Sequence, residues 1–227
     1  SGARTPADYQ RALEAIQAEN DYMSQLVENL LAVARADAGQ APLRAELVDL
    51  GDIALEAVER LAPLARERGV ALTAGELPEV YVRGDRAYLA RMLANLVENA
   101  VKYTAGTGSH VGVAAGAAQR GTTPGAARDE WAFVRVSDDG PGIAPEHLPH
   151  LFERFYRVDA ARTRDVIPSD DAGEIGETGT GDEAFVGSGL GLAIAQWVAQ
   201  AHSGEIVAES VAGSGSAFTV WLPLDGR

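Results

Sequence analysis

Residues 85–103 of this 227-residue chain read DRAYLARMLANLVENAVKY, and no other stretch of the sequence has so regular a pattern. The apolar residues recur at steps of three and four, which is the spacing of one face of an α-helix. They are Leu89, Met92, Leu93, Leu96, Val97, Ala100 and Val101. The spacing predicts an amphipathic helix over 85–102 whose apolar side lies in the core.

Three polar residues follow a row beside that apolar stripe. Asn95, Asn99 and Lys102 stand at positions i, i+4 and i+7, on one side of the predicted helix. An Asn oxygen suits Mg²⁺ that phosphates already neutralise in part, and a Lys ammonium reaches phosphate oxygens. The alternative is an ordinary solvated helix edge. Lys102 is the only Lys in a chain with nineteen basic residues, and this favours a functional row.

Other segments complete an α+β pattern around this helix. We expect a helix over about 49–68, a helix that begins near 187–191 and ends near Gly204, and a loop over 116–128. Strands are predicted at 70–73, 81–82, 110–114, 131–137, 205–210 and 216–222. The mixture predicts a two-layer α/β sandwich, with helices on one face of a mixed, mostly antiparallel sheet.

A long helix is predicted ahead of this domain. From about 5 to 37 the apolar residues again recur at helical steps, and such a helix is roughly 50 Å long. A stripe of that length exceeds what a small domain buries, so a partner helix is implied; packing on its own domain is the alternative. We therefore divide the chain into residues 1–40 and 41–227.

Two glycine-rich segments have the composition of ligand-binding turns. Asp138, Gly140 and Gly142 directly follow a predicted strand; the glycines permit a sharp turn, and an ionised Asp accepts from an amine such as that of adenine. Gly187, Gly189 and Gly191 precede a helix whose first backbone N–H groups attract anions. An ordinary turn and a linker are the alternatives. Neither segment has the spacing of a dinucleotide or Walker motif.

Composition excludes several other classes of function. The net charge of −14 argues against general nucleic-acid binding, and the absence of cysteine excludes disulfides and thiolate metal sites. No apolar run approaches the roughly 20 residues that span a bilayer, so a soluble, cytoplasmic fragment is expected. His147 and His150 lie close in sequence, but no third ligand is spaced to complete a metal site.

Taken in order, these segments resemble the sensor histidine kinases of two-component systems. Residues 95–103 are similar to the N box of that family, 138–143 to its first glycine box, and 152–157 to its F box. Residues 187–192 and 213–218 are similar to its second and third glycine boxes. The resemblance implies the Bergerat ATP-binding fold of the GHKL proteins, which is shared with gyrases, Hsp90 and mismatch-repair ATPases.

The resemblance also implies a role for each motif residue. Asn95 and Lys102 approach the phosphates as catalytic residues, Asn99 holds Mg²⁺, and Arg157 or Arg162 touches the γ-phosphate. Residues 158–186, an acidic stretch without periodicity, form the ATP lid. The positions that contact the base or the phosphates of ATP are Tyr103, Asp138, Gly140, Gly142, Ile143, Gly187, Gly189, Leu190, Gly191 and Leu192.

The activity that the resemblance implies is transfer of the γ-phosphoryl group of ATP to a histidine, for relay to a response regulator. Hydrolytic relatives carry a water-activating Glu where Asn95 stands, which favours transfer. Residues 5–37 resemble the second helix of the family's dimerisation and phosphotransfer domain, so the acceptor helix, the homodimer and any membrane anchor are expected to need segments outside this chain. A regulatory nucleotide-binding module and an ATP-hydrolysing relative are the alternatives.

Overall fold

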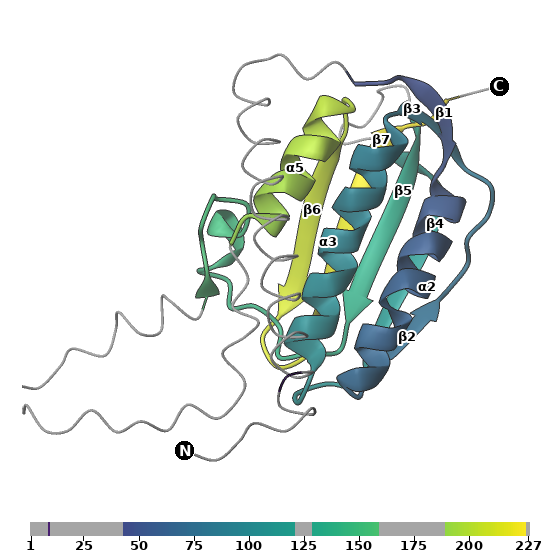
Figure 1. Ribbon diagram of the computed structural model, residues 1–227. Helices are drawn as coiled ribbons and strands as arrows, with labels where there is room; N and C mark the ends of the chain where they lie inside the picture. The colour runs from purple at the N-terminus through teal and green to yellow at the C-terminus, as the bar shows by residue number, and fades with distance from the viewer. Residues whose placement is uncertain (1–8, 10–42, 121–128, 159–188, 226–227) are drawn as a thin grey trace, which may run out of the picture. The chain divides into compact units, whose positions relative to one another are not determined.

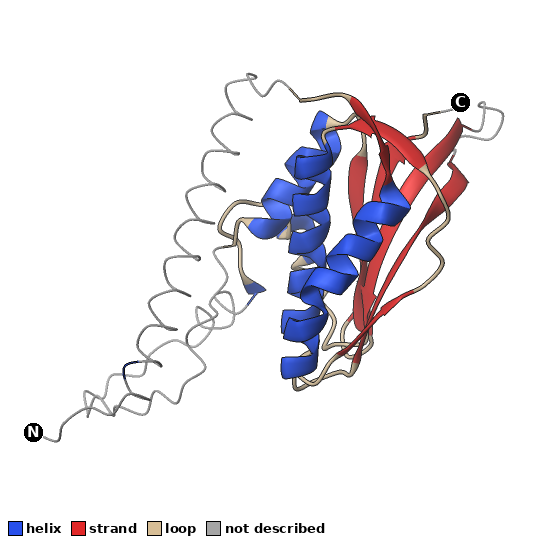
Figure 2. Ribbon diagram, turned by 45° about the vertical axis from the view of Figure 1, so that its right-hand side comes forward, coloured by secondary structure: helices blue, strands red, loops and turns tan. Residues whose placement is uncertain are grey.

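The computed structural model describes residues 43–120, 129–158 and 189–225, together with Tyr9. The chain divides into two compact units, residues 1–41 and residues 42–227. In the second unit, three helices lie side by side over one five-stranded sheet (Figure 1). Figure 2 shows the same helices along one face of that sheet. The predicted two-layer α+β fold is confirmed.

The main sheet has the strand order β2-β4-β5-β7-β6. Only β2 and β4 pair in parallel; the other neighbours are antiparallel, as predicted. A second sheet pairs β1 with β3, and β1 was not predicted. The strands are β1 (Glu46–Asp49), β2 (Ala71–Ala74), β3 (Tyr81–Gly84), β4 (His110–Arg120), β5 (Asp129–Asp138), β6 (Glu205–Val211) and β7 (Gly215–Pro223).

The helices are α2 (Leu50–Glu67), α3 (Arg86–Thr104) and α5 (Gly191–Ala201), and a short 3-10 helix, η1, spans Leu148–His150. Asp49 caps α2 by accepting from the Gly51 N–H, and Asp85 caps α3 by accepting from the Ala87 and Tyr88 N–H groups. The apolar residues predicted for α3 are buried, so this helix forms the centre of the core between α2 and α5.

The loop predicted over 116–128 begins too early, and its residues 121–128 lie outside the described residues. β4 continues to Arg120 and pairs with β5 from Asp129 onward. A Cβ on Gly116 would meet the Phe133 ring at 2.9 Å, and the Arg120 guanidinium lies 5.1 Å from the centre of the Trp221 ring. Small residues with low strand propensity are thus held in the strand because aromatic side chains of β5 and β7 pack over them.

His202 connects the end of α5 to the start of α3. Its buried ring accepts from the Asp85 N–H at 2.9 Å through Nε2, and Nδ1 donates to the Val198 carbonyl at 2.7 Å. Gly84 packs against this ring, because a Cβ there would lie 2.5 Å from the imidazole Cδ2. The link fixes the relative position of the two helices that carry the predicted phosphate-side residues.

Two predicted segments lie outside the described residues. They are the helix over 5–37, apart from a helical Tyr9, and the lid over 158–186, apart from Val158. Among the helices of the described ranges, none is both long enough and apolar enough to cross a membrane.

Candidate active site

Asp138 stands at the end of β5, opposite Ser216 of β7. Its Oδ1 accepts from the Gly140 N–H at 3.0 Å and from the Ser216 N–H at 3.2 Å. Burial raises the pKa of this carboxyl, the two backbone hydrogen bonds act in the opposite direction, and the adjacent Asp139 charge raises it further. The result is an oriented carboxylate that retains capacity to accept from a ligand amine.

The turn after Asp138 is hydrogen-bonded to β6 and to the turn between β6 and β7. Pro141 accepts from the Gly213 N–H at 2.7 Å, and the Ile143 N–H donates to Ser210 Oγ at 2.8 Å. Gly142 has a φ of 67°, and a Cβ on it would overlap the Val211 carbonyl oxygen. The sequence therefore needs glycine here both for the backbone angle and for the close approach of β6.

Asp139, unlike Asp138, accepts hydrogen bonds from the residues that lead into β4. Its carboxylate accepts from the His110 N–H at 2.7 Å, from the Ser109 N–H at 2.8 Å and from the Ser109 hydroxyl at 2.9 Å. The hydrogen bonds from the His110 and Ser109 N–H groups lower the pKa of this exposed carboxyl. Asp139 thereby anchors the connection between α3 and β4, a role that the sequence analysis did not assign.

On α3, two predicted residues face the start of α5. Asn95 is only 7% exposed, and its Nδ2 donates to the Gly191 carbonyl at 3.4 Å. The Nδ2 atom of Asn99 lies 3.6 Å from the position that a Cβ on Gly191 would take. The structure thus brings residues nearly a hundred positions apart in sequence to one place.

The start of α5 is tied to the segment 152–157. The Phe155 N–H donates to the Gly189 carbonyl at 3.0 Å, and a Cβ on Gly189 would lie 2.8 Å from the Phe155 Cα. Both residues have positive φ, 64° for Phe155 and 69° for Gly189. Leu190 is fully buried and precedes α5, whose start has no side-chain cap. Backbone N–H groups at the start of a helix attract anions, so the start of α5 is a candidate phosphate site.

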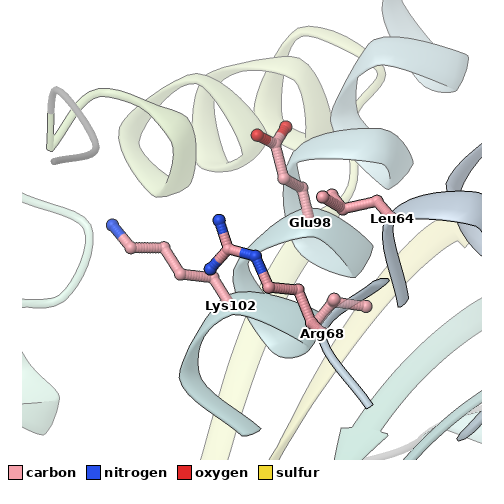
Figure 3. Close-up of a pocket in the computed structure, with 5 residues that line it drawn as sticks. Leu64, Arg68, Glu98 and Lys102 are labelled. Atoms are coloured by element: carbon pink, nitrogen blue, oxygen red, sulfur yellow. The ribbon is translucent and has the colours of Figure 1, made fainter. Parts of the chain in front are cut away.

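Lys102 and Tyr103 lie one turn further along α3. The Lys102 Nζ is 5.2 Å from the centre of the Tyr103 ring, and this ring is 46% exposed. Lys102 also lines a small pocket between α2 and α3 with Leu64, Arg68, Glu98 and Val101. Figure 3 shows Arg68, Glu98 and Lys102 extending to the same side of the two helices. Arg68 was not predicted to belong to the site.

The remaining predicted residues are placed as follows. Gly140 is buried against Asp138 and Thr104, and Ile143, Arg157 and Leu192 are half-buried. Gly187 and Arg162 lie outside the described residues. The sequence analysis did not name Thr104 or Asp139, and it included Ser216 only within the segment 213–218. Asp139 could have been noticed as the second of two consecutive carboxylates after a strand, whereas Thr104 lay beyond the predicted end of its helix.

These residues fit a purine nucleotide and a magnesium ion. Asp138 offers an oriented acceptor for a base amine. The exposed Tyr103 ring offers a flat apolar surface, and this residue precedes Thr104, which lies against Gly140. In the described ranges, no group of three or more His, Cys, Asp or Glu side chains could hold a metal. Asn99 could hold Mg²⁺ through its amide oxygen, with phosphate oxygens and water as the other ligands, which is how this ion commonly binds.

Comparisons with known proteins identify the family of this chain. The family described as histidine kinase-, DNA gyrase B- and HSP90-like ATPase matches residues 84–226. The chain is 32% identical to the sensor histidine kinase RppB of Synechocystis over 93% of its length, and 35% identical to the signal transduction histidine-protein kinase AfsQ2 of Streptomyces coelicolor over 94%. It spans 40% and 33% of the lengths of these relatives.

A solved structure shares the fold. The crystal structure of full-length ShkA in complex with AMPPNP is 24% identical and superposes with a TM-score of 0.69. The match covers 99% of this chain and 41% of that chain.

Proposed function

The chain belongs to the histidine kinase-, DNA gyrase B- and HSP90-like ATPase family, and we propose that it is the phosphoryl donor part of a sensor histidine kinase. It binds Mg·ATP and transfers the γ-phosphoryl group to a histidine outside this chain. A response regulator aspartate then receives that group. The relatives named above, both histidine kinases, support this proposal over the other branches of the family.

The observation that carries the proposal is the meeting of three separate segments. They are Asp138 at the end of β5, the Asn95 and Asn99 face of α3, and the start of α5. All belong to one compact unit, in which α3 packs against both β5 and α5. An acceptor for a base, an amide ligand for a cation and a helix terminus for phosphate are the parts that phosphoryl transfer from a nucleotide requires.

In the transfer step, a ring nitrogen of the acceptor histidine attacks the γ-phosphorus of ATP. The bond between that phosphorus and the β,γ-bridging oxygen breaks, and ADP leaves with the electron pair. Mg²⁺ neutralises phosphate charge when bound. Asp138 holds the base, the backbone N–H groups at Gly191 and Leu192 orient the phosphates, and Lys102 adds a positive charge beside them.

One feature favours transfer over hydrolysis, and a second indicates where the acceptor lies. Asn95 is buried, carries no carboxylate and uses its amide to hold Gly191, so it offers no base to activate water. The four histidines of the chain all lie in the described ranges, and each ring is already hydrogen-bonded, His202 inside the core. We therefore place the acceptor on another polypeptide segment.

We further propose that residues 1–40 supply the second helix of a dimerisation and phosphotransfer domain, and that residues 41–227 form the catalytic domain with a lid over about 158–186. The alignments with RppB and AfsQ2 support the first assignment, because they extend over 93% and 94% of the chain. Homodimerisation and membrane anchoring would then be properties of the whole protein.

The test mixes this chain with Mg·ATP and a separate fragment that carries an acceptor helix. ATP binding is measured first, with Mg²⁺ and with EDTA, and acid-labile phosphate on the acceptor is measured second. Transfer that requires Mg²⁺ supports the proposal. Tight binding without any phosphohistidine would instead favour a regulatory module, and release of inorganic phosphate would favour an ATPase.

A further inference from the structure

A pocket between α2 and α3 brings together three charged side chains from two helices. Its lining residues are Leu64, Arg68, Glu98, Val101 and Lys102. Figure 3 shows Arg68 at the end of α2 extending to the same side as Glu98 and Lys102 of α3. All three charged residues are half-buried, so a ligand can reach them. The pocket thus sets two cations against one carboxylate, in a chain whose net charge is −14.

Lys102 connects this pocket with the proposed phosphate side of the site. On α3 it follows Asn99 by three positions and Glu98 by four, so its side chain lies between theirs on the helix surface. Asn99 Nδ2 lies 3.6 Å from the position of a Cβ on Gly191, at the start of α5. A phosphate chain that lies at the start of α5 and meets Lys102 is therefore beside the part of α3 that Arg68 borders.

The backbone of Arg68, and not its side chain, ends α2. Its N–H donates to the Leu64 carbonyl at 3.0 Å, a hydrogen bond that any residue except proline can make. Gly69 follows with a φ of 70° and takes up the turn after the helix. Replacing the guanidinium should therefore leave the end of α2 intact, so its role can be tested by substitution.

We propose that Arg68 is a second cation for the phosphate chain of ATP, beside Lys102, and that Glu98 competes with the phosphates for these two cations. This inference rests on the proposed ATP binding. It adds a binding residue from α2, a helix that supplies none of the groups for base, cation or phosphate named above.

The chemistry of the three side chains explains the arrangement. In an acidic chain, an anion is held only by cations placed close to it. A guanidinium donates to phosphate oxygens through two N–H groups at once, whereas the Lys102 ammonium acts as a point charge. The Glu98 carboxylate repels phosphate and attracts both cations. Removal of Arg68 and removal of Glu98 should therefore change ATP affinity in opposite directions.

The experiment measures ATP and adenosine affinity by calorimetric titration. Arg68→Gln should weaken ATP binding about three- to thirtyfold, between the effect of a surface ion pair and that of a hydrogen bond to a charged group. Glu98→Gln should tighten ATP binding about two- to fivefold. The double variant keeps the net charge of the pocket and should lie between the two single variants. Adenosine affinity should stay the same in all three, because adenosine carries no phosphate.

Arg66→Gln is the matched control, because it removes the same charge from the last turn of α2 at an exposed residue that does not line the pocket. Its ATP affinity should equal that of the unmodified chain at about 0.15 M salt, which screens distant surface charges. Arg68→Lys keeps the charge and should retain most of the affinity. Arg68→Met keeps the alkyl chain, and it must weaken ATP binding as Arg68→Gln does if the glutamine variant fails to fold.

Three results would overturn the role of Arg68. They are equal losses in Arg66→Gln and Arg68→Gln, equal losses for ATP and adenosine, and unchanged ATP affinity in Arg68→Gln and Arg68→Met while Lys102→Gln is impaired. In each case the proposed function still stands, because the unmodified chain binds ATP. Absence of ATP binding in the unmodified chain overturns the proposed function as well.

Discussion

The proposed base side and the proposed phosphate side of the candidate site differ in how tightly their glycines are packed. On the base side, backbone fixes the shape: Gly142 and Gly215 leave no space for a Cβ beside the Val211 and Asp138 carbonyl oxygens. On the proposed phosphate side, Gly189 is also packed tightly, against the Phe155 backbone, but a Cβ on Gly191 would meet only ordinary contacts, 3.6 Å from Asn99. Gly142 is thus required by the fold, whereas the position of Gly191 can change without unfolding it.

This difference predicts that some glycine substitutions will lower the free energy of unfolding, whereas others will mainly lower ATP affinity. Gly142→Ala should have the largest effect, destabilising the fold by about 2–4 kcal/mol, because it adds a strained positive φ and a clash with Val211. Urea unfolding of the free protein measures this. Gly191→Ala is the control and should change unfolding by less than about 1 kcal/mol; equal losses in the two variants would contradict the comparison.

Asp138→Asn should have the second-largest effect, and this effect should be on ATP affinity. The amide oxygen can still accept from Gly140 and Ser216, so the fold should persist, while the charged acceptor for the base amine is lost. We expect ATP affinity to fall about 10- to 100-fold, as for a hydrogen bond to a charged group. Titration of a fluorescent nucleotide analogue measures it. Unchanged affinity would refute the assignment of Asp138 to the base.

Gly191→Ala should reduce ATP affinity by a smaller amount, about two- to tenfold, even though the fold is intact. The added methyl group would stand beside Asn99 at the uncapped start of α5, where phosphates are proposed to lie. Calorimetric titrations with ATP and with adenosine distinguish this effect from damage to the base side. Adenosine affinity should be unaffected, and an equal loss for both ligands would place the defect elsewhere.

The smallest expected effects are on the pH dependence of the free energy of unfolding. They have opposite signs for the carboxyls of Asp138 and Asp139. The raised pKa of Asp138 means that the folded state holds a proton that the unfolded state has lost, so its contribution to stability falls as pH rises through that window. The lowered pKa of Asp139 contributes stability above the usual carboxyl range, which is lost as pH falls through the folded value. Unfolding curves of Asp138→Asn and Asp139→Asn between pH 3 and 7 (roughly the carboxyl range) test this; changes of the same sign would contradict it.

Regular patterns made much of the fold predictable. The apolar stripe of α3 predicted a buried helix, and the alternation in β6 and β7 predicted a strand pair. β1 was missed because its four residues pair only with β3, far along the chain. The end of β4 was misread because Gly116 and its small neighbours have low strand propensity, and the aromatic residues that hold them belong to other strands.

The candidate site was predictable where chemistry depends on a motif, and less so where it depends on packing. Asp138, Asn95 and Gly191 were named from their spacing, and the structure places Asn95 against Gly191. The contact of Ser216 with Asp138 had no spacing signal, because its N–H reaches that carboxylate only where β7 returns beside β5. The anchoring of Asp139 to Ser109 and His110 likewise depends on the return of β4 beside β5.

The central claim is that this chain donates phosphate to a histidine that it does not contain. The most direct test incubates it with Mg·ATP labelled at the γ-phosphate and a fragment with an acceptor helix, and follows label on that fragment. We predict acid-labile, base-stable label that requires Mg²⁺ and is strongly reduced with Asp138→Asn when ATP is limiting. Label that stays on this chain, or appears only as inorganic phosphate, would contradict the claim.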